Sequence, residues 1–217
     1  MENGINNLLK GYNMLLYFTG SMIMNEPTEE CVIDFWANGS LKRLPVSSSN
    51  PKFMKAAAVL RDPCADKENC RKLLASDFKM LFSAEGEALA LPVASAYSSE
   101  KSKIRIATPQ AEYFYNSFGW KNAYLEKPPD HLGIELLFLT RLIEKFMLLD
   151  DIPCRNEMKR EIALFLEACI LSWLPSWNEK VQEHAASVQY KGIGMLICAC
   201  IEDLYGIFST REARYNN

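Results

Sequence analysis

Two adjacent prolines constrain the fold of this chain more than any other feature. They belong to the segment Glu126-Lys127-Pro128-Pro129-Asp130-His131, which runs directly into an apolar stretch from Leu132 to Leu149. Proline fixes φ and lacks a backbone N–H, so no helix can continue through this point from the N-terminal side. A new helix is therefore predicted to begin just after the prolines.

The apolar residues that follow recur at three- and four-residue spacing. They are Leu132, Leu136, Leu139, Ile143 and Phe146. This period predicts one buried stripe along a helix. Asp130 is predicted to be the N-cap, because a short carboxylate can accept the free amide hydrogens of the first turn. His131 and Glu135 share a face of this helix. With Glu126 they form a candidate polar cluster; the plain alternative is a capped helix start with His131 as a surface residue.

Composition bounds the class of protein. The chain has 217 residues, of which 49% are hydrophobic and 24% charged, typical of a globular protein of one large or two small domains. The net charge of −3 provides no basic field for a phosphate backbone, so no nucleic acid partner is expected. A cationic peptide fits this charge better.

The cysteines and the N-terminal sequence indicate the compartment. The seven cysteines are an odd number, and several stand in apolar helical patterns, so reduced thiols are expected rather than a disulfide framework. The start Met1-Glu2-Asn3 lacks the basic region of a secretory signal. The apolar run from Met14 to Met24 contains Thr19, Gly20 and Ser21 and is too short to span a bilayer. A cytoplasmic protein without stable membrane insertion is predicted.

Helical periodicity recurs along the chain, and strand alternation is weak, although residues 103–108 could be briefly extended. The class predicted is all-α, a single globular bundle-like domain of about ten helices. It would span residues 1–217, with possible subdomains 1–125 and 126–217 joined by the Glu126–His131 loop. The helices are expected in residues 5–23, around Val32, Phe35 and Trp36, in 51–61, 66–83, 108–119 and 132–149, and along two stripes, 158–173 and 193–208.

The predicted helix 66–83 carries a second polar candidate. Leu73, Leu74, Phe78, Leu81 and Phe82 form one stripe, and Asp77 stands beside it. Taken alone, this pattern is typical of core packing with an acidic residue at the surface.

These segments together resemble a known family. The Glu-x-Pro-x-Asp-His loop followed by Leu-Gly-x-Glu-Leu-x-Phe-Leu is similar to the signature of the TorD/DmsD family of cytoplasmic chaperones for molybdenum enzymes, which are nitrate reductase delta-subunit-like. The segment Leu74-x-x-Asp77-Phe78-x-x-Leu81-Phe82 resembles the family's Leu-x-x-Asp-Phe/Tyr-x-x-Leu-Phe segment. The resemblance covers most of the chain, from the first helix to about Tyr205.

One stretch departs from the family pattern. Pro92, Ser95 and Tyr97 match the family's Pro-Trp-Glu-Ser-x-Tyr, but Val93 and Ala94 replace its tryptophan and glutamate. An aromatic contact from that tryptophan to a bound peptide is therefore not expected here.

The resemblance implies a chaperone that binds the twin-arginine leader and the apoprotein of a DMSO-reductase-family molybdopterin oxidoreductase. Such a chaperone assists cofactor insertion, prevents premature export, and is a monomer or a homodimer. The implied peptide-binding residues come from the segments just described. They are Glu126, Pro128, Pro129, Asp130, His131, Glu135, Leu74, Asp77, Phe78, Leu81, Phe82, Pro92 and Tyr97.

The chemistry of these side chains suits an arginine-rich peptide. Guanidinium groups pair bidentately with carboxylates, for which Glu126, Asp130 and Glu135 are the candidates. The leader's apolar segment would lie as a helix in a groove lined by Leu81, Phe82 and Tyr97. His131 could orient Asp130 or bond a peptide carbonyl, with its pKa lowered by the helix N-terminus.

Enzymatic motifs are absent from the sequence. It contains no Gly-x-Gly-x-x-Gly, Gly-x-Ser-x-Gly or His-Glu-x-x-His, and only two histidines. Cys198 and Cys200 point about 200° apart on a helix and are poor joint metal ligands. We therefore expect no catalytic residue, no cofactor and no metal. The alternatives that stay open are a helical adaptor or dimerising scaffold without leader specificity and, with less support, a nucleotide hydrolase.

Overall fold

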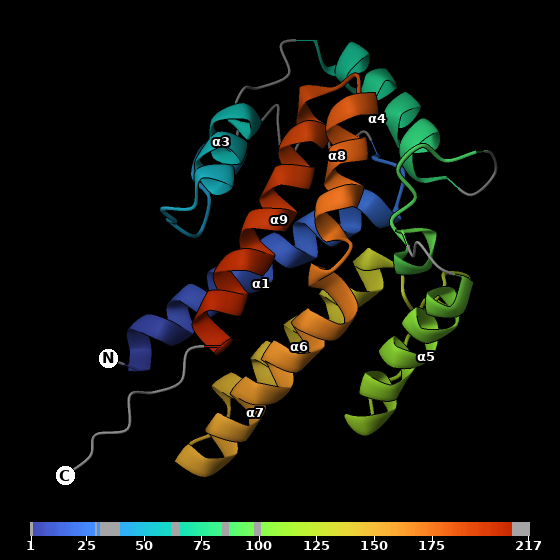
Figure 1. Ribbon diagram of the computed structural model, residues 1–217. Helices are drawn as coiled ribbons and strands as arrows, with labels where there is room; N and C mark the ends of the chain where they lie inside the picture. The colour runs from blue at the N-terminus through green and yellow to red at the C-terminus, as the bar shows by residue number, and fades with distance from the viewer. Residues whose placement is uncertain are drawn as a thin grey trace.

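Helices form nearly all the regular structure of this chain (Figure 1). The computed structural model describes residues 2–28, 30, 40–61, 66–83, 87–97 and 101–209. Its α-helices are α1 (Glu2–Met24), α3 (Pro51–Leu60), α4 (Lys67–Phe82), α5 (Lys101–Ser117), α6 (Leu132–Met147), α7 (Ile152–Phe165), α8 (Leu174–His184) and α9 (Val188–Ser209). Two 3₁₀ turns, Ser40–Lys42 and Ala94–Tyr97, and a π-helical segment, Leu166–Leu171, complete the set.

The all-α prediction is confirmed. The only β-type pairing among the described residues is an isolated antiparallel bridge between Val93 and His131. The predicted helix around Val32, Phe35 and Trp36 lies outside these residues.

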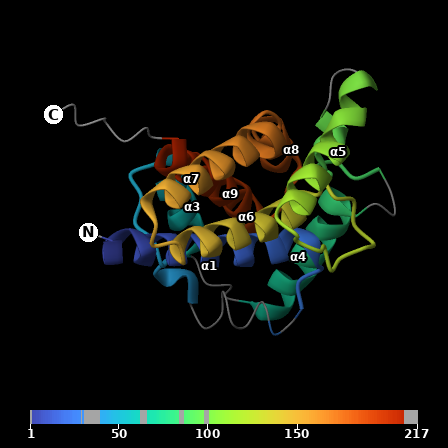
Figure 2. The ribbon, with the colours of Figure 1, turned by 90° about the horizontal axis from the view of Figure 1, so that it is seen from below.

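The C-terminal helix α9 is the centre of the packing. It packs against α1, α3, α7 and α8 and runs through the middle of the bundle (Figure 1). From below, α1 and α6 lie alongside each other (Figure 2). Within the part of the chain that is described, α9 alone is long and apolar enough to cross a membrane, but 67% of its most apolar window is buried. Those properties are also typical of a core helix.

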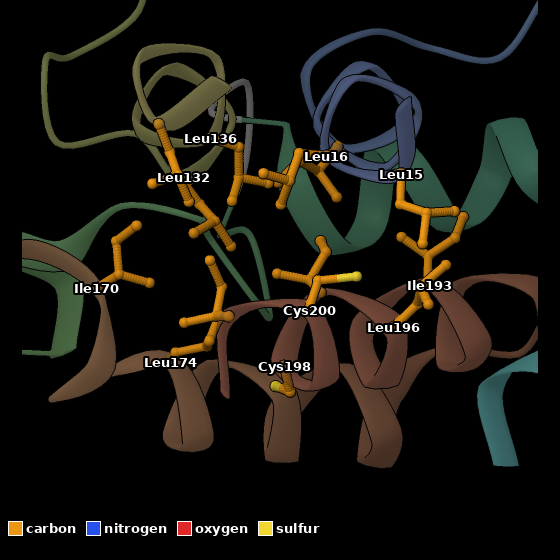
Figure 3. Packing of buried hydrophobic residues seen from close by; sticks show 14 of the residues in the cluster. Leu15, Leu16, Leu132, Leu136, Ile170, Leu174, Ile193, Leu196, Cys198 and Cys200 are labelled. Carbon is orange, nitrogen blue, oxygen red and sulfur yellow. The ribbon is translucent and has the colours of Figure 1, made fainter. Parts of the chain in front are cut away.

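Side chains from several helices meet in this core (Figure 3). Leu16 of α1 and Leu136 of α6 point toward Cys200 of α9, whereas Cys198 lies on the opposite side of that helix. The two thiols therefore diverge, as the helical spacing predicts. A Cβ at Gly192 of α9 would stand 2.9 Å from Leu60 Cδ2 of α3, so the glycine permits this close approach of two helices.

The cysteines require one correction. Cys154, Cys169, Cys198 and Cys200 are free thiols, but Cys70 is disulfide-bonded. The expectation that all thiols are reduced is therefore wrong for Cys70. An odd count and apolar surroundings cannot predict whether one pair comes within bonding reach, because tertiary distances decide that.

The start of α5 also differs from the prediction. The sequence predicts a helix that starts at residue 108, but α5 begins at Lys101 and Pro109 lies inside it. A proline in a helix interior removes one hydrogen bond and costs about 3 kcal/mol. The segment Lys103-Ile104-Arg105-Ile106-Ala107 has no strong helix breaker, so the helix continues across it. The predicted end is confirmed, since Gly119 adopts φ +64° just after α5.

Asp77 of α4 is buried and binds the backbone directly before α9. Its side chain is 1% exposed, and its carboxylate accepts hydrogen bonds from the N–H groups of Ala186 (3.2 Å) and Ser187 (2.7 Å). These donors lie directly before α9, where backbone N–H groups lack helical partners and the dipole favours negative charge. The interpretation of Asp77 as a surface acid is therefore wrong.

Replacing Asp77 is expected to destabilise the fold. Asp77→Ala should lower the free energy of unfolding by about 2–3 kcal/mol, because it leaves the buried N–H of Ser187 and the partly buried N–H of Ala186 without their charged acceptor. Asp77→Asn, which keeps an acceptor, should lose less. Urea denaturation measures both, with Asp66→Ala, at the exposed cap of α4, as the control. Equal losses for Asp77→Ala and Asp66→Ala would contradict this role.

Candidate functional site

The Glu126–His131 loop is held against residues 92–95 by backbone hydrogen bonds. The N–H of Ala94 donates to the Asp130 carbonyl (3.0 Å), and the N–H of Leu132 donates to the Pro92 carbonyl (2.8 Å). Together with the Val93–His131 bridge, these bonds join the loop to a segment far away in the sequence. Pro92 is buried in this contact. The start of α6 is thus fixed from outside its own helix.

Asp130 lies in the middle of this contact. It is 0% exposed, and Oδ2 accepts a hydrogen bond from the N–H of Ser95 (2.9 Å). Oδ1 has no hydrogen-bond partner within the described part of the chain. The prediction that Asp130 caps α6 is therefore wrong: the bridge turns its carboxylate toward residues 92–95 instead of the first turn of α6.

His131 is the actual N-cap of α6. Its Nδ1 accepts a hydrogen bond from the N–H of Gly133 (3.0 Å), and its ring is 5% exposed. Burial, with a smaller contribution from the charge of Lys127, lowers the pKa of His131 to about 3. The predicted direction of the pKa shift is confirmed, but burial rather than the helix dipole is its largest cause. The neutral ring is required because a protonated Nδ1 cannot accept the Gly133 N–H.

Glu135 lies beneath the loop on the first turn of α6. It is 0% exposed, and neither carboxyl oxygen has a hydrogen-bond partner among the described residues. Burial raises the pKa of Glu135 well above its usual value, and the charge of Asp130 raises it further. The two acids are thus close enough to interact, as predicted, but Glu135 is not presented to solvent.

A tyrosine supports the loop from α5. The Tyr115 hydroxyl donates to the Pro129 carbonyl (2.7 Å), and its ring contacts Phe138 of α6 with centroids 4.8 Å apart. Burial raises the pKa of Tyr115, with Glu135 and Asp130 contributing. The sequence does not predict this contact, because Tyr115 and the proline pair are joined by tertiary packing and not by a regular spacing.

The remaining residues of the predicted set divide between surface and core. Glu126 and Pro128 are exposed, and Pro129 and Phe78 are half-buried. Leu74 and Leu81 are fully buried, and Phe82 is 6% exposed. The Phe82 ring contacts those of Trp177 (6.3 Å) and Tyr190 (5.2 Å). Leu81 and Phe82 therefore do not line a surface groove, because their stripe faces α8 and α9.

Tyr97 is the accessible aromatic residue beside the loop. It is half-buried and stacks on Trp173, with ring centroids 5.4 Å apart. Lys180 Nζ lies 4.9 Å from the Tyr97 ring centroid, and the tyrosine hydroxyl has no partner in the described ranges. The indole Nε1–H of Trp177 donates a hydrogen bond to the Ala90 carbonyl (3.0 Å), which holds the chain just before residues 92–95.

The potential metal ligands of the described residues do not form a cluster. Over the described residues, no three or more His, Cys, Asp or Glu side chains group in a way that could hold a metal ion. The site therefore contains a buried acidic pair, Asp130 in the loop and Glu135 on the first turn of α6, bordered by the aromatic residue Tyr97.

Comparison with known proteins identifies the family. The family model described as "Nitrate reductase delta subunit" matches residues 48–179, which include Tyr97, the Glu126–His131 loop and Trp177. The chain belongs to the nitrate reductase delta subunit family. The predicted relationship is thereby confirmed.

Curated proteins that resemble this chain carry the name chaperone protein TorD. The protein from Vibrio vulnificus (strain YJ016) is 30% identical over 141 residues, 64% of this chain and 66% of the relative. That from Actinobacillus pleuropneumoniae serotype 3 is 31% identical over 131 residues, 59% of this chain and 60% of the relative. The chain thus spans slightly less than two thirds of these relatives. Their names are those of chaperones and not of enzymes, in agreement with the prediction.

Proposed function

We propose that this protein is a cytoplasmic chaperone that binds the twin-arginine leader and the apoprotein of a molybdopterin oxidoreductase. It holds the client until its cofactor is inserted and so prevents premature export. The similarity to proteins named chaperone protein TorD supports the general function. The observation that carries the leader assignment is the unpaired, buried carboxylate oxygen of Asp130 within the Glu126–His131 loop.

Asp130 is the proposed acceptor for a leader arginine. A buried carboxylate oxygen without a partner is unfavourable, and a guanidinium that reaches it forms a charge-assisted hydrogen bond. Glu126 is exposed on the same loop and provides a second carboxylate at the entrance. Because Asp130 is 0% exposed, the loop and residues 92–95 have to separate when the arginine enters.

Glu135 responds to the arginine rather than binding it directly. In the free protein, burial and the charge of Asp130 raise its pKa and so favour its protonated form. A cation placed on Asp130 offsets the acidic charge that raises the pKa of Glu135, so binding favours release of its proton. Before the arginine enters, the raised pKa of Glu135 therefore disfavours a second buried negative charge beside Asp130.

The apolar segment of the leader is proposed to lie across Tyr97 and Phe78. Both are half-buried, and Tyr97 rests on Trp173. Lys180 lies over the ring of Tyr97 and would move aside when a peptide covers that ring. This surface replaces the predicted groove of Leu81 and Phe82, which lie in the core.

The test is a calorimetric titration with a synthetic twin-arginine leader peptide. Asp130→Asn is expected to weaken binding by at least about tenfold, because it removes the charge and preserves the shape. Replacing both leader arginines by lysine should also weaken binding, since lysine cannot pair bidentately. Glu157→Gln, on the exposed surface of α7, is the matched control and should leave the affinity unchanged.

Two results would contradict this proposal. The first is equal affinity of Asp130→Asn and Glu157→Gln for the leader peptide. The second is the absence of any unprocessed Arg-Arg oxidoreductase among the proteins that co-purify with the tagged chaperone from anaerobic native cells. A protein that failed both tests would be a helical adaptor without leader specificity.

A further inference from the structure

A concave surface lies between residues 42–48 and helix α3. It has a volume of about 570 Å³, within the range of about 300–1,000 Å³ typical of ligand sites. Helix α3 packs on α9 at the side of the bundle away from α5 (Figures 1 and 2). The groove is therefore separate from the Glu126–His131 loop.

Three positive side chains line this groove. Lys42, Arg43 and Arg61 are exposed, and none of them has an ion-pair partner in the described part of the chain. No acidic residue is among the described residues that line it. Lys52, also on α3 but outside the groove, is by contrast paired with Glu202. A concentration of unpaired positive charge in a chain of net charge −3 marks this groove as distinct.

The rest of the lining is largely apolar. Phe53 and Val46 are 3% and 6% exposed, and Met54 is 56% exposed at the surface. Ala57 and Ala58 add only methyl groups, which allow a bound chain to approach α3 closely. Methionine adapts its shape to a variable partner. The groove thus combines positively charged side chains with a largely apolar surface.

We propose that this groove binds an acidic peptide segment that carries an apolar side chain. The arginine forks would pair with its carboxylates, and its apolar side chain would cover Phe53 and Met54. A free phosphate has no apolar part to bury on this surface and is disfavoured. The twin-arginine leader is excluded by like charge. The groove therefore binds a different segment of a partner protein, and this assignment stands without the leader site.

Fluorescence anisotropy tests the groove in the full-length protein. The probe is a short fluorescein-labelled peptide of alternating glutamate and leucine. Its affinity should decrease as salt rises, and the double variant Arg43→Glu/Arg61→Glu should bind at least about tenfold more weakly. Lys55→Glu/Arg160→Glu changes the net charge equally at exposed positions outside the groove and should retain the affinity of the natural protein.

Each alternative has its own outcome. Equal binding of the probe by the two double variants, with circular dichroism showing both folded, would overturn the site. Equal binding of a glutamate-only peptide would contradict the apolar contact, and displacement of the probe by equimolar pyrophosphate would indicate a phosphate site instead. Asp130→Asn should leave probe binding unchanged, so failure of the groove and failure of the leader site are distinguishable.

Discussion

Acidification is expected to destabilise this protein through His131. The ring titrates at about 6.5 when unperturbed, but burial lowers its pKa to about 3 in the fold. Between these values the unfolded chain binds a proton that the folded chain rejects. The free energy of unfolding therefore has its full value above pH 6.5. It decreases as the pH falls from 6.5, and this loss is complete once the pH has passed about 3. The free energy of unfolding should decrease by about 1.4 kcal/mol per pH unit in this window, or about 4–5 kcal/mol in total.

Urea denaturation between pH 3 and 7 measures this dependence. Carboxylates also titrate in that range, so the result depends on the comparison with His131→Asn, whose amide oxygen can still accept the Gly133 N–H. This variant should show a shallower decline than the natural protein. His184→Asn, which changes the half-buried histidine at the end of α8, is the control and should keep the full slope. An unchanged slope in His131→Asn would contradict the assignment.

The fold class followed from local patterns in the sequence. The stripe from Leu132 to Phe146 predicted α6, and the prolines before it predicted where α6 begins. Asp66 and Gly119 marked a helix start and a helix end correctly. These features depend on neighbours in sequence, where spacing and backbone preference decide the outcome. Pro109 is the exception, because a single lost hydrogen bond does not end a helix.

The site depended on contacts that spacing does not encode. Asp130 bonds to Ser95 and Asp77 to Ser187, so both acids serve distant backbone rather than their own helices. The sequence predicted that Glu126, Asp130, His131 and Glu135 gather at one helix start. The last three lie buried together there, whereas Glu126 is exposed on the loop. The sequence could not predict their burial. Burial raises the pKa of Glu135 and lowers that of His131, and the free Oδ1 makes Asp130 the candidate acceptor.

Phe138 links this site to the rest of the bundle, and truncating it is expected to lower the free energy of unfolding strongly. Phe138 is fully buried, and its ring contacts those of Tyr115 (4.8 Å), Phe165 (5.0 Å) and Trp120 (5.4 Å). It thereby joins α5, α6 and α7. Phe138→Ala should lower the free energy of unfolding by about 3–5 kcal/mol, through lost burial, a cavity and lost ring contacts. Urea denaturation at pH 7 measures this loss.

The control for this prediction is Phe146→Ala on the same helix. Phe146 is 2% exposed, and its ring contacts Phe208 at 5.3 Å, far from the loop along α6. Both truncations should destabilise the fold, but only Phe138→Ala removes the ring that positions Tyr115, whose hydroxyl holds the Pro129 carbonyl. The amides of Ala94, Ser95 and Leu132 should then exchange hydrogen faster in Phe138→Ala at equal global stability. Equal exchange of these amides in both variants would show that the loop is held independently of the aromatic core.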